Sequence, residues 1–121
     1  MLKDDFAMRD VDTLANTIAR LVLKKENLDY TPSGLEADAQ ADGLWFALDQ
    51  YMKAGDFNAA EDLLYESADW DDLRYLEMGV AFYAHLNHLS DKELAEGGFS
   101  REEVGEGLRD LAEEFGVDLK L

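Results

Sequence analysis

Two histidines have a spacing that could serve metal chemistry. His85 and His88 are three residues apart in a stretch with helical periodicity, so their imidazoles share one face of a helix. A metal site needs a further ligand, and the nearest carboxylates, Asp91 and Glu93, lie beyond the expected end of that helix. We therefore expect surface histidines, with His85 and His88 as weak candidates for a metal site, and we expect no cofactor.

The other residue patterns give little sign of catalysis. The chain has no cysteine, which excludes thiolate metal sites, iron–sulfur clusters and cysteine nucleophiles. The run Asp69-Trp70-Asp71-Asp72 has spacing like that of a calcium loop, but Arg74 stands at the sixth position, where such a loop needs glycine. Most of the serines occupy expected helix caps, and no Gly-x-Ser-x-Gly motif occurs. We predict no catalytic residue and a protein that is not an enzyme.

Two aromatic side chains near carboxylates are candidates for a binding surface. Phe46 projects away from the apolar face that Leu44 and Leu48 share, so it either packs on the N-terminal helix or is an exposed anchor for a partner. Trp70 poses the same choice among its neighbouring aspartates. An acidic rim around an aromatic residue favours a basic peptide. The predicted partner-binding residues are Phe46, Asp69, Trp70, Asp71 and Asp72.

The charge of the chain limits the classes of partner. Its 121 residues include 28 acidic and 11 basic side chains, for a net charge of −17. Such a surface repels a nucleic-acid backbone and an anionic membrane, because binding to either depends on Lys and Arg. We expect a non-catalytic interaction module that binds a protein or peptide of basic character. The alternatives are an acidic mimic of nucleic acid that inhibits a DNA-binding protein and, third, a small metal-dependent enzyme centred on His85 and His88.

The cellular location of the protein is predicted from three features that the sequence lacks. Cysteine is absent, as is common in a reducing cytoplasm, and no apolar run approaches the roughly 18 to 20 residues that a membrane span needs. The first residues also lack the order of a signal peptide. These observations favour a cytoplasmic protein.

The elements that carry these residues are all expected to be helices. Pro32 is the only proline, and apolar residues recur with helical spacing along most of the chain. We predict an amphipathic N-terminal helix over about residues 4–26 and a central helix over about residues 71–89, which is apolar around most of its circumference. Capping boxes are expected where serine precedes glutamate by three residues, at Ser33/Glu36, Ser90/Glu93 and Ser100/Glu103.

One segment resembles a tetratricopeptide helical hairpin. Leu44, Ala47, Leu48 and Tyr51, the turn Gly55-Asp56-Phe57, and then Ala60 and Leu64 carry the resemblance. A poorer copy begins with Tyr75, Met78, Gly79 and Phe82 and is interrupted from Leu89 to Gly98. The resemblance implies antiparallel helical hairpins in a single helical domain, 1–121. Its parts would be an N-terminal helix in 1–30, a first hairpin over 41–72 and a second, irregular hairpin with an insertion over 73–116.

The N-terminal stretch carries a second resemblance. Asp5-Phe6-Ala7-Met8-Arg9, followed by Leu14, Ile18, Ala19 and Arg20, looks like the opening of a family of small, all-helical bacterial proteins of unknown function. That resemblance implies an α-helical, tetratricopeptide-like fold and a bacterial origin, and it implies no activity. A homodimer is compatible with this reading, because short hairpin arrays often need a partner to cover their apolar ends.

Overall fold

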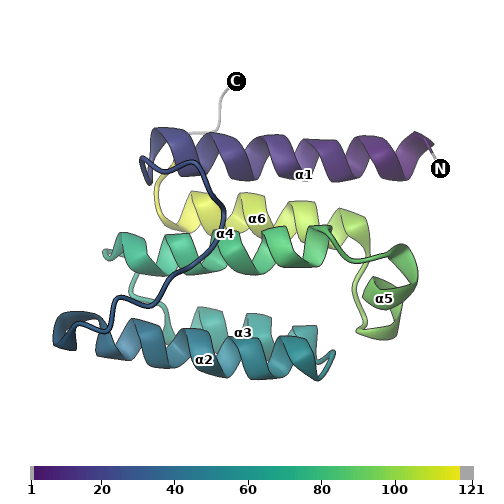
Figure 1. The fold of residues 1–121 in the computed structure, drawn as a ribbon. Helices are drawn as coiled ribbons and strands as arrows, with labels where there is room; N and C mark the ends of the chain where they lie inside the picture. The colour runs from purple at the N-terminus through teal and green to yellow at the C-terminus, as the bar shows by residue number, and fades with distance from the viewer. Residues whose placement is uncertain (1, 118–121) are drawn as a thin grey trace.

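The fold is all-α, as predicted. The computed structural model describes residues 2–117, and all regular structure in that range is helical (Figure 1). The elements are α1 (Leu2–Leu21), the short 3₁₀ helix η1 (Glu36–Asp38), α2 (Ala39–Lys53), α3 (Phe57–Ser67), α4 (Leu73–Asn87), α5 (Asp91–Glu96) and α6 (Arg101–Glu114).

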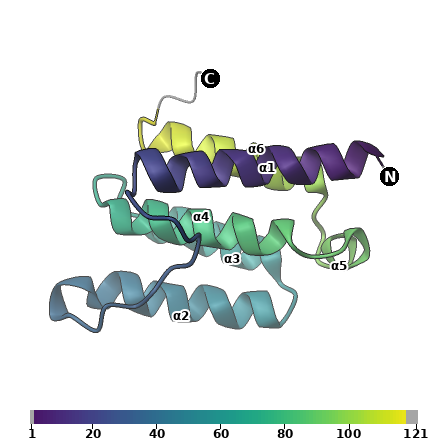
Figure 2. The ribbon, with the colours of Figure 1, turned by 45° about the horizontal axis from the view of Figure 1, so that its top comes forward.

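The helices form three layers, with α4 in the middle. The closest backbone approaches pair α1 with α6, both of these with α4, and α2 with α3 and α4. Figure 1 shows α1 at one edge of the molecule and α2 with α3 at the opposite edge, and Figure 2 shows α2 as the outermost helix on that side. Most of α4 is buried, including Leu76, Phe82 and Tyr83. Its apolar circumference thus makes α4 the central helix, as the sequence predicts.

The N-terminal helix is shorter at its C-terminal end than predicted. Its apolar face, with Val11, Leu14 and Ile18, is buried against the other layers as expected. However, α1 ends at Leu21, and Lys24, which was expected inside the helix, has a φ of 57°. Such a left-handed residue terminates a helix, so residues 22–35 run as an irregular linker from α1 to η1.

Two of the three predicted capping boxes form. At Ser90/Glu93 and at Ser100/Glu103 the serine hydroxyl accepts the backbone N–H of the glutamate, and the glutamate carboxylate accepts the backbone N–H of the serine. The prediction for Ser33 is wrong. Its hydroxyl donates to Asp38 Oδ2 at 2.6 Å instead, and the next helix begins at Glu36 without a side-chain cap.

The insertion from Leu89 to Gly98 packs over the turn of the α2–α3 hairpin. Leu94 on α5 is buried, and Phe57 meets Phe99 edge to face with ring centroids 6.3 Å apart. A Cβ at Gly97 would lie 2.3 Å from the Phe57 ring, so only glycine fits there. Arg101 holds the segment in place, because its guanidinium donates to the carbonyls of Asn87 and Leu89.

Candidate binding site

A groove of about 520 Å³ lies between α3 and α6. Both helices lie behind α2 and α4 in the view of Figure 1. The groove is open to solvent, and its two walls come from segments about forty residues apart in the sequence. Its lining residues are Glu61, Asp62 and Tyr65 from α3, and Gly107, Asp110, Glu113 and Glu114 from α6.

A tyrosine from the central helix reaches toward this groove. Tyr83 is fully buried, and its hydroxyl donates to Glu61 Oε2 at 2.6 Å. A Cβ at Gly107 would lie 2.5 to 2.7 Å from three atoms of the Tyr83 phenol. Glycine at 107 therefore leaves the space through which the Tyr83 phenol passes under α6 to Glu61.

The groove is strongly negative. Five of its seven lining residues are acidic, and the lining contains no Lys, Arg or His within residues 2–117. Burial raises the pKa of the Glu61 carboxyl, and the nearby carboxylates of Asp62, Glu103 and Asp110 raise it further, while the Tyr83 hydrogen bond opposes both. The described lining residues therefore include carboxylates and no cation that would offset their charge.

An aromatic cluster adjoins the groove. The ring of Tyr65 lies 5.5 Å from that of Trp70, and the ring of Trp70 lies 5.1 Å from that of Phe115, centroid to centroid. All three side chains are half-buried. Trp70 is thus a packed residue with one part of its surface exposed, and it lies beside the acidic lining.

The aspartates around Trp70 have mainly local roles. Asp72 caps α4, because its Oδ1 accepts the backbone N–H of Arg74 at 2.9 Å. The Asp69 carboxylate accepts the backbone N–H of Asp71 at 3.0 Å and so fixes the loop. Asp69 and Asp71 are exposed, and Asp72 is half-buried.

Phe46 is exposed, and the two aspartates nearest to it along α2 are bonded within the protein. Its side chain is 60% exposed, so it does not pack on the N-terminal helix. Asp42 is buried and bonded within the protein, and Asp49 forms an ion pair with Lys53 at 2.8 Å. Phe46 lies on α2 and Trp70 follows α3, and within residues 2–117 no ring contact joins them.

Both histidines are exposed, His85 on α4 and His88 at its C-terminal cap, and they do not converge with other ligands within residues 2–117. His88 Nε2 lies 3.5 Å from Asp12 Oδ1, and His85 lines a separate hollow beside α5. Within residues 2–117, no group of three or more His, Asp and Glu side chains could hold a metal ion.

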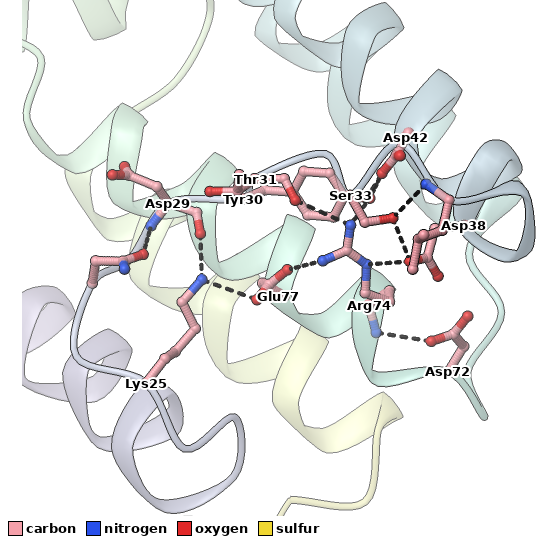
Figure 3. A network of polar contacts seen from close by, with 12 residues as sticks. Lys25, Asp29, Tyr30, Thr31, Ser33, Asp38, Asp42, Asp72, Arg74 and Glu77 are labelled. Atoms are coloured by element: carbon pink, nitrogen blue, oxygen red, sulfur yellow. Dashed lines mark hydrogen bonds and ion pairs between the residues drawn. The ribbon is translucent and has the colours of Figure 1, made fainter.

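A polar network that the sequence did not predict ties the linker to α4 (Figure 3). The Tyr30 hydroxyl donates to Asp42 Oδ1 at 2.5 Å, and Arg74 Nη2 donates to the same oxygen at 3.0 Å. The Arg74 guanidinium also lies 4.4 Å from the centroid of the Tyr30 ring. Glu77 accepts from Arg74 at 2.8 Å and from Lys25 at 2.9 Å. We call these residues, Lys25, Tyr30, Asp42, Arg74 and Glu77, the Arg74 network.

The Arg74 network is a structural tie. The hydrogen bond from Tyr30 lowers the pKa of the Asp42 carboxyl, with further lowering from the Gly34 backbone N–H and Arg74. Burial and the bond to Asp42 raise the pKa of the Tyr30 hydroxyl, so it stays a donor. The members of the Arg74 network come from three separate segments of the chain, so the spacing of residues in the sequence gave no sign of it.

The groove was missed for a related reason. Adjacent carboxylates such as Glu113 and Glu114 carry little information in a sequence where acidic residues occur throughout the chain. One signal was present: the stretch 57–67 contains no Lys or Arg, and neither do residues 110–116.

These features define an all-α protein of packed helices with an acidic groove. The chain belongs to a family of unknown function (DUF6483), whose model matches residues 1–116. That range contains every helix described above. Comparison with curated proteins and with solved structures gave no match. No helix in residues 2–117 combines the length and the apolar character that a membrane span requires.

Proposed function

We propose that this protein is a non-catalytic interaction module that binds a basic segment of a partner protein in the α3–α6 groove. The observation that carries the proposal is the acidic lining without a compensating cation, set beside the Tyr65–Trp70–Phe115 cluster. An acidic groove also suits the partner of basic character that the sequence predicts. Of the two aromatic anchors predicted from the sequence, the proposal uses Trp70.

The lining suits Lys and Arg side chains in two ways. Their charged ends would relieve the repulsion among the carboxylates of the lining, which adds to burial in raising the pKa of Glu61. Their aliphatic stems and the planar guanidinium of Arg would pack on the exposed parts of Trp70 and Tyr65. The net charge of −17 would in addition attract such a partner from a distance, an effect that weakens as salt is added.

The arrangement of hairpins fits this role. We propose that α2–α3 and α4–α6 follow the tetratricopeptide plan, with α5 as the insertion between the second pair. Proteins built from helical hairpins commonly present peptide-binding grooves between helices.

A labelled basic peptide tests the groove. The probe is a short amphipathic helical peptide with Lys and Arg on one face and leucine on the other, and its control carries Glu in place of Lys and Arg. Fluorescence anisotropy measures the dissociation constant of each at several salt concentrations. We expect the basic peptide to bind with an affinity that falls as salt rises, and the acidic control not to bind.

Matched variants on α6 locate the binding. Asp110→Asn with Glu114→Gln removes two charges from the groove, while Glu102→Gln with Glu106→Gln removes two exposed charges from the side of α6 that faces α1. If each lost contact contributes about 0.2–1 kcal/mol, the groove pair weakens binding about two- to thirtyfold. The control pair should change it less. Equal weakening by both pairs would show that net charge alone attracts the peptide, and would refute the groove.

Another outcome concerns the alternative function. A DNA-binding protein that is bound by this chain and released by added DNA would favour the acidic mimic of nucleic acid, because such a mimic occupies the DNA surface itself. A basic peptide that DNA does not compete for at the groove favours the interaction module.

A further inference from the structure

The outward face of α2 is almost free of charge. Seven residues of α2 are exposed, and Lys53 is the only charged one; it is paired with Asp49. By contrast, all seven exposed residues of α6 are charged. Figure 2 shows α2 as the outermost helix on the side opposite α1. The uncharged exposed residues of this face are Ala39, Gln40, Gly43, Phe46, Gln50 and Tyr51.

Gly43 has no evident role within the chain. It lies inside α2, where glycine is the least favourable residue apart from proline. A Cβ at Gly43 would meet nothing within 4 Å among the described residues. In other helices the glycines at 79 and 107 do have a role, because a Cβ there would collide with Leu111 or Tyr83. Gly43 instead leaves the α2 backbone open to close approach from outside.

Phe46 projects beside this opening. It lies three residues after Gly43 and so on the same side of α2, and its side chain is 60% exposed. Ala47, four residues after Gly43, borders the same shallow surface and is half-buried. The face therefore presents an aromatic projection next to a shallow depression.

We propose that two copies of this chain associate through the outward face of α2. With the two α2 helices antiparallel about a two-fold axis, Phe46 of each copy packs over Gly43 and Ala47 of the other. A two-fold interface requires a surface that is complementary to itself, and a projection beside a depression meets that requirement. This proposal does not rest on the groove or on its proposed function.

Charge selects a second copy over other occupants. Each chain carries −17, so two copies repel each other through most surfaces, and a face without charge reduces that repulsion. A basic partner would gain more from surfaces rich in carboxylates, such as the groove. The uncharged face thus suits a partner that is itself strongly acidic, as another copy is.

The size of the face sets the strength of the contact. A helix as long as α2 measures about 22 Å by about 10 Å, which is less than the ~800 Å² that each partner contributes to a standard interface. We therefore expect a weak dimer that forms with increasing concentration. Salt should strengthen it by screening the net negative charges, whereas salt weakens a basic peptide in the groove.

Sedimentation velocity over micromolar to millimolar concentrations, at low and high salt, tests the dimer. The parent protein should shift from the mass of one chain toward that of two, and more so at high salt. Phe46→Glu should raise the dissociation constant about tenfold or more, because each dimer contains Phe46 twice. Leu21→Glu is the matched control: it adds the same charge at a leucine that is 66% exposed on α1, and it should leave association unchanged.

Four outcomes decide the matter. A parent that stays monomeric at all concentrations and salts overturns the dimer, as does equal weakening by Phe46→Glu and Leu21→Glu. Circular dichroism checks that both variants fold, and the salt dependence of the parent gives a test that needs no variant. If Phe46→Glu loses the dimer and still binds the basic peptide, the dimer and the groove are separate sites. If the peptide does not bind the parent but the dimer forms, only the groove fails.

Discussion

Three glycines within helices should respond differently to replacement by alanine. The free energy of unfolding should rise for Gly43→Ala and fall for Gly79→Ala and Gly107→Ala. Gly43, Gly79 and Gly107 all lie within helices and none of them has a positive φ, so the helix itself gains from each substitution. The gain is about 0.5–1 kcal/mol, because alanine loses less backbone entropy on folding. What differs between the three positions is the space that the new methyl group enters.

The surroundings of each glycine set the net result. At Gly43 the methyl enters open space, so the free energy of unfolding should rise by about 0.5–1 kcal/mol. At Gly107 it would lie 2.5 to 2.7 Å from the rigid, buried phenol of Tyr83, and overpacking of this kind costs about 1–3 kcal/mol. At Gly79 the methyl would lie 2.3 Å from the buried Leu111 side chain. Gly107→Ala and Gly79→Ala should therefore lower stability, by up to about 2 kcal/mol after the helix gain.

Urea unfolding measures the free energy of unfolding of all three variants. The protein is kept dilute and at low salt, so that the proposed dimer does not contribute to the result. The midpoint should move upward for Gly43→Ala and downward for the other two, with an unchanged slope. In the sedimentation experiment Gly43→Ala should also weaken the dimer. If Gly43→Ala destabilises the dilute monomer, Gly43 has a role within the chain, and the inference drawn from its open surroundings is refuted.

Four further substitutions test the polar interactions. Tyr30→Phe should lower the melting temperature by a few degrees near neutral pH, because Asp42 and Arg74 lose a partner. Since the fold lowers the pKa of Asp42, the stability at issue is present above its ordinary value of 3.8, so the difference between parent and variant should shrink as the pH falls below that value. Glu61→Gln should stabilise the protein at neutral pH, because burial raises the Glu61 pKa and the fold favours a neutral side chain there; in pH-dependent melting the gain should disappear toward pH 4.5. Ser100→Ala should lower the free energy of unfolding by about 1 kcal/mol through loss of the α6 cap, and Ser33→Ala by less, which chemical denaturation can compare.

Local signals in the sequence predicted most of the helices. The boxes at Ser90 and Ser100 form because their partners lie only three residues away and no other group competes for them. The same pattern at Ser33 fails because the Ser33 hydroxyl accepts the backbone N–H of Leu35 and donates to Asp38, and the helix begins only at Glu36. Other nearby groups thus replace the expected capping box where the linker meets η1.

The binding surfaces depend on distances that a single sequence does not encode. The groove forms where the segment around Glu61 meets the segment around Asp110, and the Arg74 network joins Tyr30 to a residue 44 positions away. Periodicity identifies which side of a helix is apolar, but not which helix lies opposite. The exposure of Phe46 and the packing of Trp70 followed from that arrangement, and the sequence left both open.

The irregular linker of residues 22–35 has a consequence for the dynamics of the protein. Helix α1 docks on α4 and α6 through its apolar face, and the linker is what joins it to the remaining helices. Helices α2 to α6 follow one another through shorter connections, so we expect them to form one cooperative unit and α1 to open as a second unit. Native-state hydrogen exchange should then show α1 amides exchanging through a smaller opening than those of α4. Tyr30 and Arg74 hold the linker against α4, and weakening their contacts should make that opening more frequent.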